Sequence, residues 1–211
     1  MKKVLIGTTN PSKIRRFRTL LADYDVEFCT LKDLGIDTEP NETGTTPEEN
    51  AALKAAYYGQ FFDLVLCNDS GLFFEGLPLD DKRQPGLKIR SPQGKRLNDE
   101  EMIEYYSQLV HSLGGKCTAY YLDGYAVYNH GKTFSFMMHD MSSAFDMVDC
   151  PTEKRHEGWP LDALSVDKQT GLYFTDKEYM ASDEEKDEII RGEYRKKVSS
   201  FLAEHLGIEL K

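Results

Sequence analysis

Residues 64–71 read LVLCNDSG, four apolar residues followed at once by a polar cluster. The apolar run, Leu64–Cys67, predicts a buried strand of a sheet. The polar cluster has two interpretations. Asn, Asp, Ser and Gly all favour turns, so residues 68–71 are typical of a loop that ends the strand. Alternatively, Asp69 closes the strand because ligands of α/β sheets bind outside the carboxyl ends of strands, where a carboxylate would meet them.

Strands and helices alternate before this stretch. Residues 2–8 (KKVLIGT) predict a first strand, which is followed by an amphipathic helical pattern and by a short strand at 26–30. Residues Thr46–Glu49 combine a helix N-cap, a proline at the first helical position and a glutamate three residues after the cap. They predict a helix that ends near Gly59. This β-α-β-α-β order is typical of a layered α/β fold.

The second half of the chain mixes helices and strands. In order, we expect a long surface excursion at 76–97, a helix at 98–113, strands within 116–139 and 144–148, and a helical region that opens with a capping box at Ser182 and ends near Leu206. A hairpin turn is predicted at Asn129–Gly131, with Asp123-Gly124 as a competing turn signal. The sequence shows no repeat and no clear linker.

Charge and composition limit the classes of partner. The 211 residues suffice for one large domain or two small lobes, and a hydrophobic content of 40% excludes global disorder. Acidic residues outnumber basic ones by 36 to 26, whereas binding to nucleic acids and anionic membranes requires positive potential. We therefore expect neither partner. A small phosphorylated ligand needs only a few local cations.

Cysteine and histidine spacing favours neither a zinc site nor a disulfide framework. The four cysteines form no C-x-x-C pair, and the five histidines form no H-x-x-x-H or H-E-x-x-H pair. Reduced, mostly buried thiols are expected instead. The sequence has no signal-peptide pattern and no apolar run long enough to span a membrane. Together these features predict a soluble, cytoplasmic protein.

The first strand-to-helix junction, TTNPSK at 8–13, has the features of an anion site. Thr8, Thr9 and Asn10 bring small polar groups and backbone N–H groups to a helix N-terminus, where the helix dipole favours negative charge. Lys13 lies about one turn into the helix and can reach a phosphate. An ordinary capped helix with a solvated lysine fits the same pattern, and the spacing of a P-loop is absent.

Two carboxylates and a second lysine lie near the next junctions. Glu42 belongs to a loop rich in Gly and Thr, Lys54 lies two turns into the following helix, and Asp69 follows the next strand. Each residue alone is typical of a solvated side chain. If the junctions share one edge of the sheet, the two carboxylates are a normal protein contribution to Mg²⁺. Lys13 and Lys54 would then offset the charge of a polyphosphate.

Three motifs, in order and with preserved spacing, carry a family resemblance over the first 71 residues. The motif T-x-N-x-x-K-x-x-E matches Thr8, Asn10 and Lys13, the motif E-T-G-x-T-x-x-E-N-A-x-x-K-A matches residues 42–55, and D-D-S-G matches Asp69–Gly71. On these motifs the sequence resembles the inosine triphosphate pyrophosphatase family, which acts on non-canonical purine nucleoside triphosphates. The resemblance is specific in these three motifs, which contain the proposed phosphate and metal residues.

The match is thinner beyond residue 71. Pro85-Gly86 matches a P-G of the family, and Gly158–Asp162 (GWPLD) stands where its pocket segment G-F-G-Y-D is expected. Lys186 and Arg191 match part of its C-terminal E-K-x-x-x-S-H-R-G. The sequence departs from the motifs at three places, which are Arg16 for glutamate, Asn68 for the first aspartate, and Ile189-Ile190 for the Ser-His.

The resemblance implies a fold, an activity and an assembly. The fold is α/β, with an elongated mixed central sheet flanked by helices and a cleft between two lobes, in which residues 1–211 form a single domain. The activity is Mg²⁺-dependent hydrolysis between the α- and β-phosphates of a purine nucleoside triphosphate, giving the monophosphate and pyrophosphate. The family is usually homodimeric, so we expect a homodimer.

The resemblance also implies residue roles. Glu42 and Asp69 would hold Mg²⁺, Asp69 would position or deprotonate a water, and Lys54 would stabilise charge on the triphosphate. The residues implied in substrate binding are Thr8, Thr9, Asn10, Lys13, Ser70, Trp159, Asp162, Lys186 and Arg191. Trp159 is a candidate to stack on the base, with plain packing as the alternative. The departures from the motifs leave a second function open, a non-catalytic nucleotide-binding or sensing protein that keeps the phosphate cradle.

Overall fold

The chain forms two compact units. The structure, a computed structural model, describes residues 1–78, 80–138, 144–156 and 159–211, apart from the side chains of residues 12 and 177–191. Unit 1 comprises Met1–Ser70, Leu122–His139 and Gly192–Lys211, and unit 2 comprises Gly71–Tyr121 and Asp140–Arg191. The long strands β3 and β4 and the last helix contribute residues to both units.

Helices and strands alternate in the first half, and strands dominate the middle of the chain. The elements are β1 (Lys2–Ile6), α1 (Pro11–Leu20), β2 (Val26–Thr30), α2 (Pro47–Tyr58), β3 (Leu64–Phe74), α3 (Asp99–Ser112), β4 (Lys116–Asn129), β5 (Lys132–Met138), β6 (Phe145–Val148), the 3-10 helix η1 (Pro160–Ala163), β7 (Ser165–Val166) and α4 (Lys177–Leu206). The expected hairpin turn is confirmed, because Asn129 pairs with Lys132 across His130 and Gly131. Both turn residues have positive φ, as a two-residue hairpin turn of type I′ requires.

The strands form one mixed sheet. Its order is β2-β1-β3-β4-β6-β7, and β5 pairs with β4. β1 runs parallel to β2 and to β3, with Leu5 opposite Val65 and Ile6 opposite Leu66. β4 is antiparallel to β5 and β6, and β6 is antiparallel to β7. The expected α/β fold, a mixed central sheet flanked by helices, is thereby confirmed.

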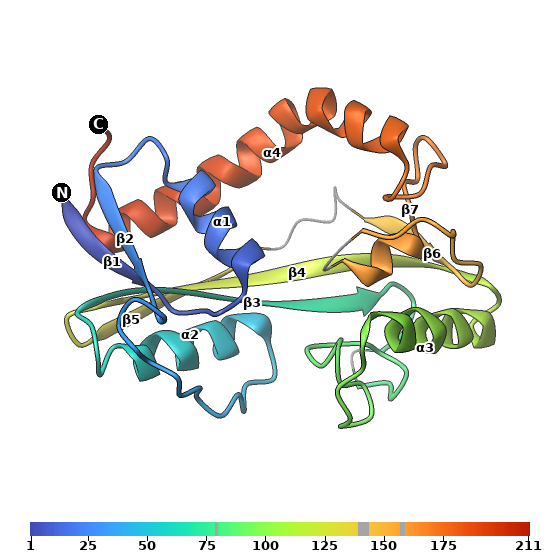
Figure 1. The fold of residues 1–211 in the computed structure, drawn as a ribbon, viewed down its shortest axis with the longest axis horizontal. Coiled ribbons are helices and arrows are strands. Elements are labelled where there is room, and N and C mark those ends of the chain that lie inside the picture. The colour runs from blue at the N-terminus through green and yellow to red at the C-terminus, as the bar shows by residue number, and fades with distance from the viewer. Residues whose placement is uncertain (79, 139–143, 157–158) are drawn as a thin grey trace. The chain divides into compact units, whose positions relative to one another are not determined.

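In unit 1, helices cover both faces of the sheet (Figure 1). Successive side chains of a strand point to opposite faces. Val4 and Ile6 accordingly pack with α1 and the C-terminal part of α4, whereas Leu5 packs with α2. Burial on both faces explains why the strand reads as a continuous apolar run. Because β1 and β3 are parallel, their carboxyl ends face the same edge of the sheet.

Unit 2 has its own hydrophobic core. The apolar face of α3, which includes the fully buried Tyr106, packs against β6 and η1. The helix starts at a complete capping box: the Asn98 side chain accepts from the backbone N–H of Glu101, and the Glu101 carboxylate accepts from that of Asn98. This box satisfies two of the N–H groups that a helix start leaves unpaired.

The course of β3 corrects the expectation for residues 68–71. The strand does not end at Cys67 but continues through the polar cluster to Phe74, so the cluster is not a turn. β4 runs beside β3, and Leu72 exchanges two backbone hydrogen bonds with Gly86. The backbone of β3 therefore has hydrogen-bond partners beyond the point where β1 ends. Asp69 therefore lies within a strand, just beyond the point where the neighbouring β1 ends at Ile6.

The start of α4 corrects a second expectation. The helix begins at Lys177, so the capping-box sequence at Ser182 lies inside it. Most residues between these two positions, Lys, Glu, Met and Ala, are strong helix formers, and they extend the helix beyond the local start signal.

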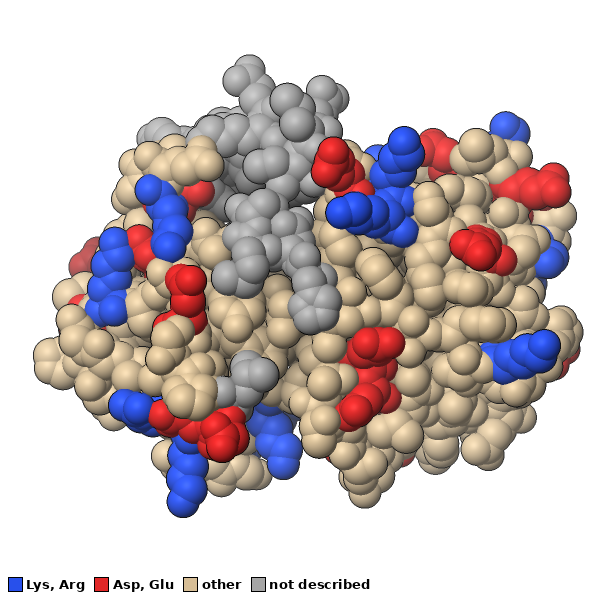
Figure 2. Space-filling model, turned by 180° about the vertical axis from the view of Figure 1, so that it is seen from behind, with Lys and Arg blue, Asp and Glu red and all other residues tan. Residues whose placement is uncertain are grey.

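No helix within the described ranges is both long and apolar enough to cross a bilayer. Figure 2 shows basic and acidic side chains interspersed over one face of the molecule rather than gathered by sign. Proteins that bind nucleic acids gather positive charge, and this face does not have that pattern.

Candidate active site

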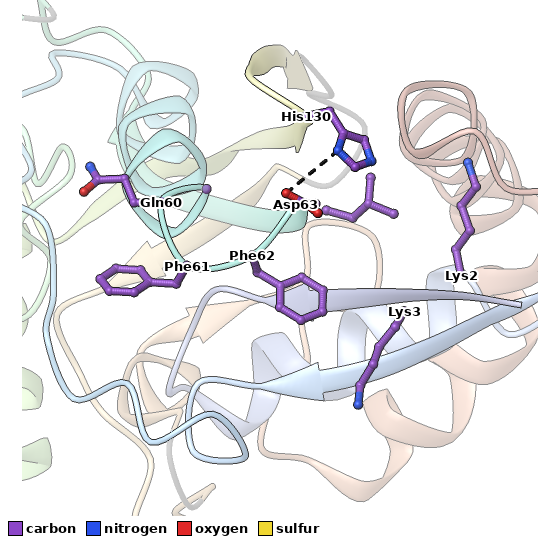
Figure 3. A pocket seen from close by; sticks show the side chains of 9 residues that line it. Lys2, Lys3, Gln60, Phe61, Phe62, Asp63 and His130 are labelled. Carbon is purple, nitrogen blue, oxygen red and sulfur yellow. Dashed lines mark ion pairs between the residues drawn. The ribbon is translucent and has the colours of Figure 1, made fainter.

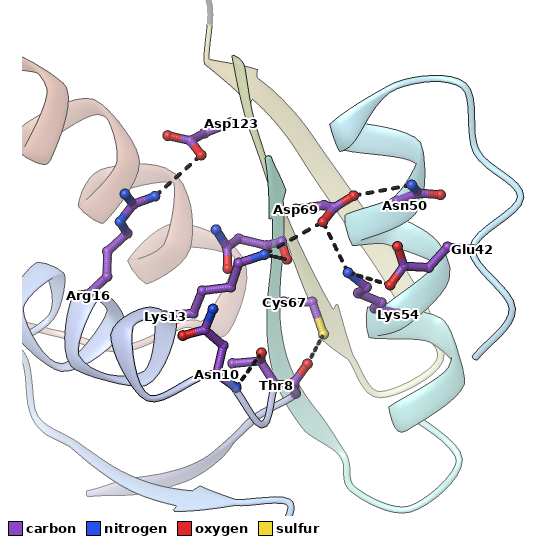
Figure 4. Close-up of polar contacts among 12 residues, drawn as sticks. Thr8, Asn10, Lys13, Arg16, Glu42, Asn50, Lys54, Cys67, Asp69 and Asp123 are labelled. Atoms are coloured by element: carbon purple, nitrogen blue, oxygen red, sulfur yellow. Dashed lines mark hydrogen bonds and ion pairs between the residues drawn. The ribbon is translucent and has the colours of Figure 1, made fainter. Parts of the chain in front are cut away.

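The loop from β1 to α1 forms the first part of the site (Figure 4). The Thr8 hydroxyl accepts a hydrogen bond from the backbone N–H of Asn10 at 3.2 Å, and the Asn10 carbonyl accepts from that of Ile14 at 3.1 Å. These bonds turn the chain directly from strand into helix. Thr9 and Asn10 are exposed there, at a helix N-terminus that favours negative charge.

The ammonium of Lys54 joins two carboxylates (Figure 4). Lys54 Nζ lies 2.7 Å from Glu42 Oε1 and 3.1 Å from Asp69 Oδ1. Lys54 comes from α2, Glu42 from the loop before it, and Asp69 from β3. The side chains of Lys54 and Asp69 are only 14% and 12% exposed, so solvent screens this pair less than an ion pair on the surface. The structure thus brings the three predicted residues together.

Lys13 approaches the same carboxylate from α1. Its Nζ lies 3.6 Å from Asp69 Oδ1 and donates a hydrogen bond to the carbonyl of Asn68 at 3.3 Å. Burial lowers the pKa of Lys13; the Asp69 carboxylate opposes this shift and the Lys54 ammonium adds to it. Burial also acts to lower the pKa of Lys54, but the carboxylates of Asp69 and Glu42 outweigh it, so that pKa is raised. Lys54 is therefore the more firmly protonated cation of the two.

Asn50 ties the loop that carries Glu42 to Asp69. Its Nδ2 donates to Asp69 Oδ2 at 3.1 Å, and its Oδ1 accepts from the backbone N–H of Gly44 at 2.8 Å. Because a backbone N–H can only donate, this bond sets the orientation of the amide. A Cβ on Gly44 would lie 2.6 Å from Asn50 Oδ1, so the close approach requires glycine.

The sequence reasoning missed Asn50 as a site residue. A signal for it was present, because Asn50 precedes Lys54 by four residues and so lies on the same face of α2. It is 2% exposed, and a buried amide has to find hydrogen-bond partners.

Two of the three departures from the family motifs, Arg16 and Asn68, also lie in this part of unit 1. Arg16 Nη1 lies 3.3 Å from Asp123 Oδ1, and the other oxygen of Asp123 accepts from the Tyr194 hydroxyl at 2.8 Å. Asn68 is 1% exposed, and its side-chain nitrogen and oxygen have no hydrogen-bond partner among the described residues. Arg16 is therefore held by a carboxylate of β4, and Asn68 adds no charge beside Asp69.

The substrate-binding residues implied by the family's pocket segment and C-terminal segment all belong to unit 2. Trp159 is 42% exposed and directly precedes η1. Asp162, within η1, lies 2.8 Å from His156 Nδ1; burial raises the pKa of this carboxyl, and His156 partly offsets that shift. Lys186 and Arg191 lie in α4, but their side chains are outside the described part of the chain, as is Gly158.

A cavity of about 520 Å³ lies elsewhere in unit 1 (Figure 3). Its lining includes Lys2 and Lys3 at the start of β1, Leu64 at the start of β3, and His130. None of the predicted site residues lines it. Ligands of α/β sheets bind at the opposite, carboxyl ends of parallel strands, so we do not assign the catalytic site to this cavity.

The donor set around Lys54 fits a hard divalent cation. Two carboxylates already converge on one cation, the Lys54 ammonium, and carboxylate oxygens are ligands that Mg²⁺ prefers. Across the described residues no group of three or more His, Cys, Asp or Glu side chains could hold a metal. An ion bound by Glu42 and Asp69 would thus take its remaining ligands from water and phosphate, as Mg²⁺ commonly does.

Solved structures share the fold. A HAM1 protein from Coxiella burnetii superimposes with a TM-score of 0.71 at 21% identity, covering 97% of this chain and 100% of that one. A nucleoside-triphosphatase / dITP/XTP pyrophosphatase from Mycobacterium abscessus gives a TM-score of 0.71 at 18% identity, covering 93% and 98%. At these identities the likeness concerns the fold alone.

Curated relatives match part of the sequence more closely. The dITP/XTP pyrophosphatase of Oceanobacillus iheyensis is 41% identical over 107 residues, which are 49% of this chain and 52% of that protein. That of Pectobacterium atrosepticum is 34% identical over 105 residues, 49% and 51% of the two chains. The chain thus spans about half the length of the curated relatives it matches. The Ham1 family model matches residues 4–142, well over half of the sequence and the whole cluster around Asp69. The family resemblance is confirmed, and the chain belongs to the Ham1 family.

Proposed function

We propose that this chain is a Mg²⁺-dependent nucleoside triphosphate pyrophosphatase acting on modified purine triphosphates such as ITP and XTP. The observation that carries the proposal is the convergence of Glu42, Lys54, Asp69 and Lys13 beside the end of β1. Two carboxylates and two lysines are the charges that a metal-bound triphosphate needs. The dITP/XTP pyrophosphatases among the relatives support the same activity.

The phosphate chain would be bound by cations and neutral donors. Lys13 and Lys54 would contact phosphate oxygens, and the loop at 8–10, exposed at Thr9 and Asn10, would offer hydroxyl and backbone donors together with Ser70. Glu42 and Asp69 would hold Mg²⁺, which when bound would polarise phosphate oxygens and neutralise part of their charge.

Asp69 would position the attacking water and accept its proton. Its carboxylate is oriented by Asn50 on one oxygen and by lysines on the other. The water oxygen bonds to the α-phosphorus while the bond from that phosphorus to the α,β-bridging oxygen breaks. The bridging oxygen keeps the electron pair and leaves as pyrophosphate. The products are the monophosphate, pyrophosphate and one proton.

Base binding belongs to unit 2 in this proposal. The exposed ring of Trp159 would stack on the purine, while Asp162, Lys186 and Arg191 would supply polar contacts to it. We also propose that the protein is a cytoplasmic homodimer whose partner is a small nucleotide rather than nucleic acid or a membrane.

The test is pyrophosphate release from ITP, dITP, XTP, GTP and ATP, with Mg²⁺ and with EDTA. We expect pyrophosphate and monophosphate in equal amounts from ITP and XTP, and complete loss of release in EDTA. Orthophosphate as the product would place the cleavage at a different bond. Triphosphate binding without any release would favour the non-catalytic nucleotide-binding alternative.

A further inference from the structure

The position proposed above for the divalent cation is occupied by a positive charge of the protein itself. The ammonium of Lys54 lies between Glu42 Oε1 and Asp69 Oδ1, at 2.7 and 3.1 Å. These are hydrogen-bonding distances, and two of the three residues are largely buried. Two carboxylates held this close to one another need a counter-charge, and Lys54 supplies it.

Asp69 presents one oxygen to this cation. Its Oδ2 accepts from Asn50 Nδ2, and the Gly44 N–H fixes that amide by donating to its oxygen. Oδ1 is therefore the oxygen that faces the cations, Lys54 at 3.1 Å and Lys13 at 3.6 Å. A divalent cation bound by Glu42 and Asp69 would use the oxygens that Lys54 now occupies.

We propose that Lys54 is an internal counter-ion that competes with the divalent cation for Glu42 and Asp69 and is released from them when metal and triphosphate bind together. This inference rests on the proposed function for the identity of the ligand. A lysine has a flexible four-carbon stem, so its ammonium can move from the carboxylates to a phosphate oxygen without backbone motion. Metal binding is consequently weak without triphosphate, and triphosphate strengthens it by drawing Lys54 away.

Calorimetric titration with Mg²⁺ alone, in the absence of nucleotide, tests the competition. Lys54→Met removes the ammonium that lies between the two carboxylates and leaves Lys13 and both carboxylates in place, so we expect Mg²⁺ to bind at least about tenfold more tightly than to the wild type. Lys54→Arg keeps a cation and Lys32→Met removes an exposed lysine of the same unit, so both variants should bind Mg²⁺ as the wild type does. Equal, weaker or undetectable binding by folded Lys54→Met, with folding checked by thermal unfolding, would overturn the proposal.

A second measurement uses the wild type. Acetylation of individual lysines by acetic anhydride is followed by mass spectrometry with Mg²⁺, and with KCl at equal ionic strength. We expect Mg²⁺ to increase the acetylation rate of Lys54 severalfold and to leave that of Lys32 unchanged. An unchanged rate at Lys54 under saturating Mg²⁺ would contradict the competition between Lys54 and the metal for the two carboxylates.

The two proposals fail separately. Tighter Mg²⁺ binding by Lys54→Met, with no pyrophosphate release by the wild type, would reject the pyrophosphatase activity and keep the counter-ion. Pyrophosphate release by the wild type, with unchanged Mg²⁺ affinity in Lys54→Met, would keep the pyrophosphatase activity and reject the counter-ion.

Discussion

The phosphate region of unit 1 and the base region proposed in unit 2 differ in how their side chains are held. Asp69 contacts side chains from two helices, Lys13 of α1 and both Asn50 and Lys54 of α2. Asp162 has a contact with His156, six residues away in the same segment, and Trp159 beside it is 42% exposed. Contacts from several elements lock a carboxylate into one geometry, whereas an exposed ring keeps its freedom.

Of the two regions, the phosphate region is the more pre-organised. The charges that would meet the phosphates are set in advance by hydrogen bonds and ion pairs, which is the arrangement expected where electrostatics lowers a barrier. The family match follows the same division, because residues 4–142 include the phosphate region and end before Trp159. Substitutions should therefore have large effects on turnover at Asp69 and small ones at Trp159.

The largest expected effect is that of Asp69→Asn. The substitution keeps the shape but removes the charge that meets both lysines, so kcat for ITP should fall at least about 100-fold. Pyrophosphate release measures kcat, and thermal unfolding should show little change in stability. Asp63→Asn, at an exposed carboxylate before β3, is the matched control and should keep full activity. Near-normal turnover by Asp69→Asn would remove this carboxylate from the mechanism.

The next prediction concerns the base. A site that hydrogen-bonds a purine oxygen rejects the wrong base strongly, whereas an apolar pocket discriminates by about 1–3 kcal/mol per group. The chain offers Trp159, Leu161 and Ile189-Ile190 in the segments matched to the family pocket. We expect kcat/KM for ITP and XTP to exceed that for ATP by about 10- to 200-fold. A preference of a thousandfold or more over both ATP and GTP would show that other residues form a polar recognition site.

Lys54→Met tests whether the ammonium of Lys54 contributes to binding and hydrolysis of the triphosphate. Without the ammonium, the charge of the triphosphate is less well balanced, so kcat/KM should fall by about thirtyfold, with both kcat and KM affected. Lys32→Met should alter neither constant. Identical behaviour of the two variants in steady-state assays would show that Lys54 contributes neither to substrate binding nor to turnover.

Asn50→Ala tests whether orientation of Asp69 matters beyond its charge. Losing both hydrogen bonds should lower kcat by about tenfold and the free energy of unfolding by about 1–3 kcal/mol. Asn98→Ala is a suitable control, since it removes the cap of α3 in unit 2 at a cost of about 1 kcal/mol. If both variants lose stability but only Asn50→Ala loses activity, the effect on turnover is separate from folding. A tenfold loss of activity in Asn98→Ala would contradict that separation.

The smallest expected effect is that of Trp159→Ala. A partly exposed ring that stacks on a purine contributes about 1 kcal/mol, so kcat/KM should fall about fivefold for ITP and for ATP alike. Leu34→Ala, at another exposed apolar side chain, provides the comparison and should leave kcat/KM unchanged. A loss confined to ITP would assign base selectivity to Trp159. No loss with either substrate would mean that Trp159 has only a packing role.

Local signals accounted for much of the fold. The apolar run of β1, the N-cap and proline of α2, and the turn at Asn129–Gly131 each act within a few residues of chain, and each lies where the sequence predicted it. Of the two errors, the start of α4 followed from strong helix formers just before the capping-box sequence, and the course of β3 followed from partners distant in the chain. Residues 68–71 favour a turn in isolation, yet they stay extended within β3, which lies between β1 and β4 in the sheet.

The α/β order of elements, the family and the residue types available for a phosphate site could be read from the chain alone, because helix caps, strand periodicity and motif spacing depend on neighbouring residues. Tertiary structure alone decided that Glu42, Lys54 and Asp69 share one point, that Asn50 fixes the orientation of Asp69, and that a lysine occupies the position between the carboxylates. These contacts join a loop, a helix and a strand that only the folded chain brings within hydrogen-bonding distance. Their geometry depends on long-range pairing and burial, which no local pattern encodes.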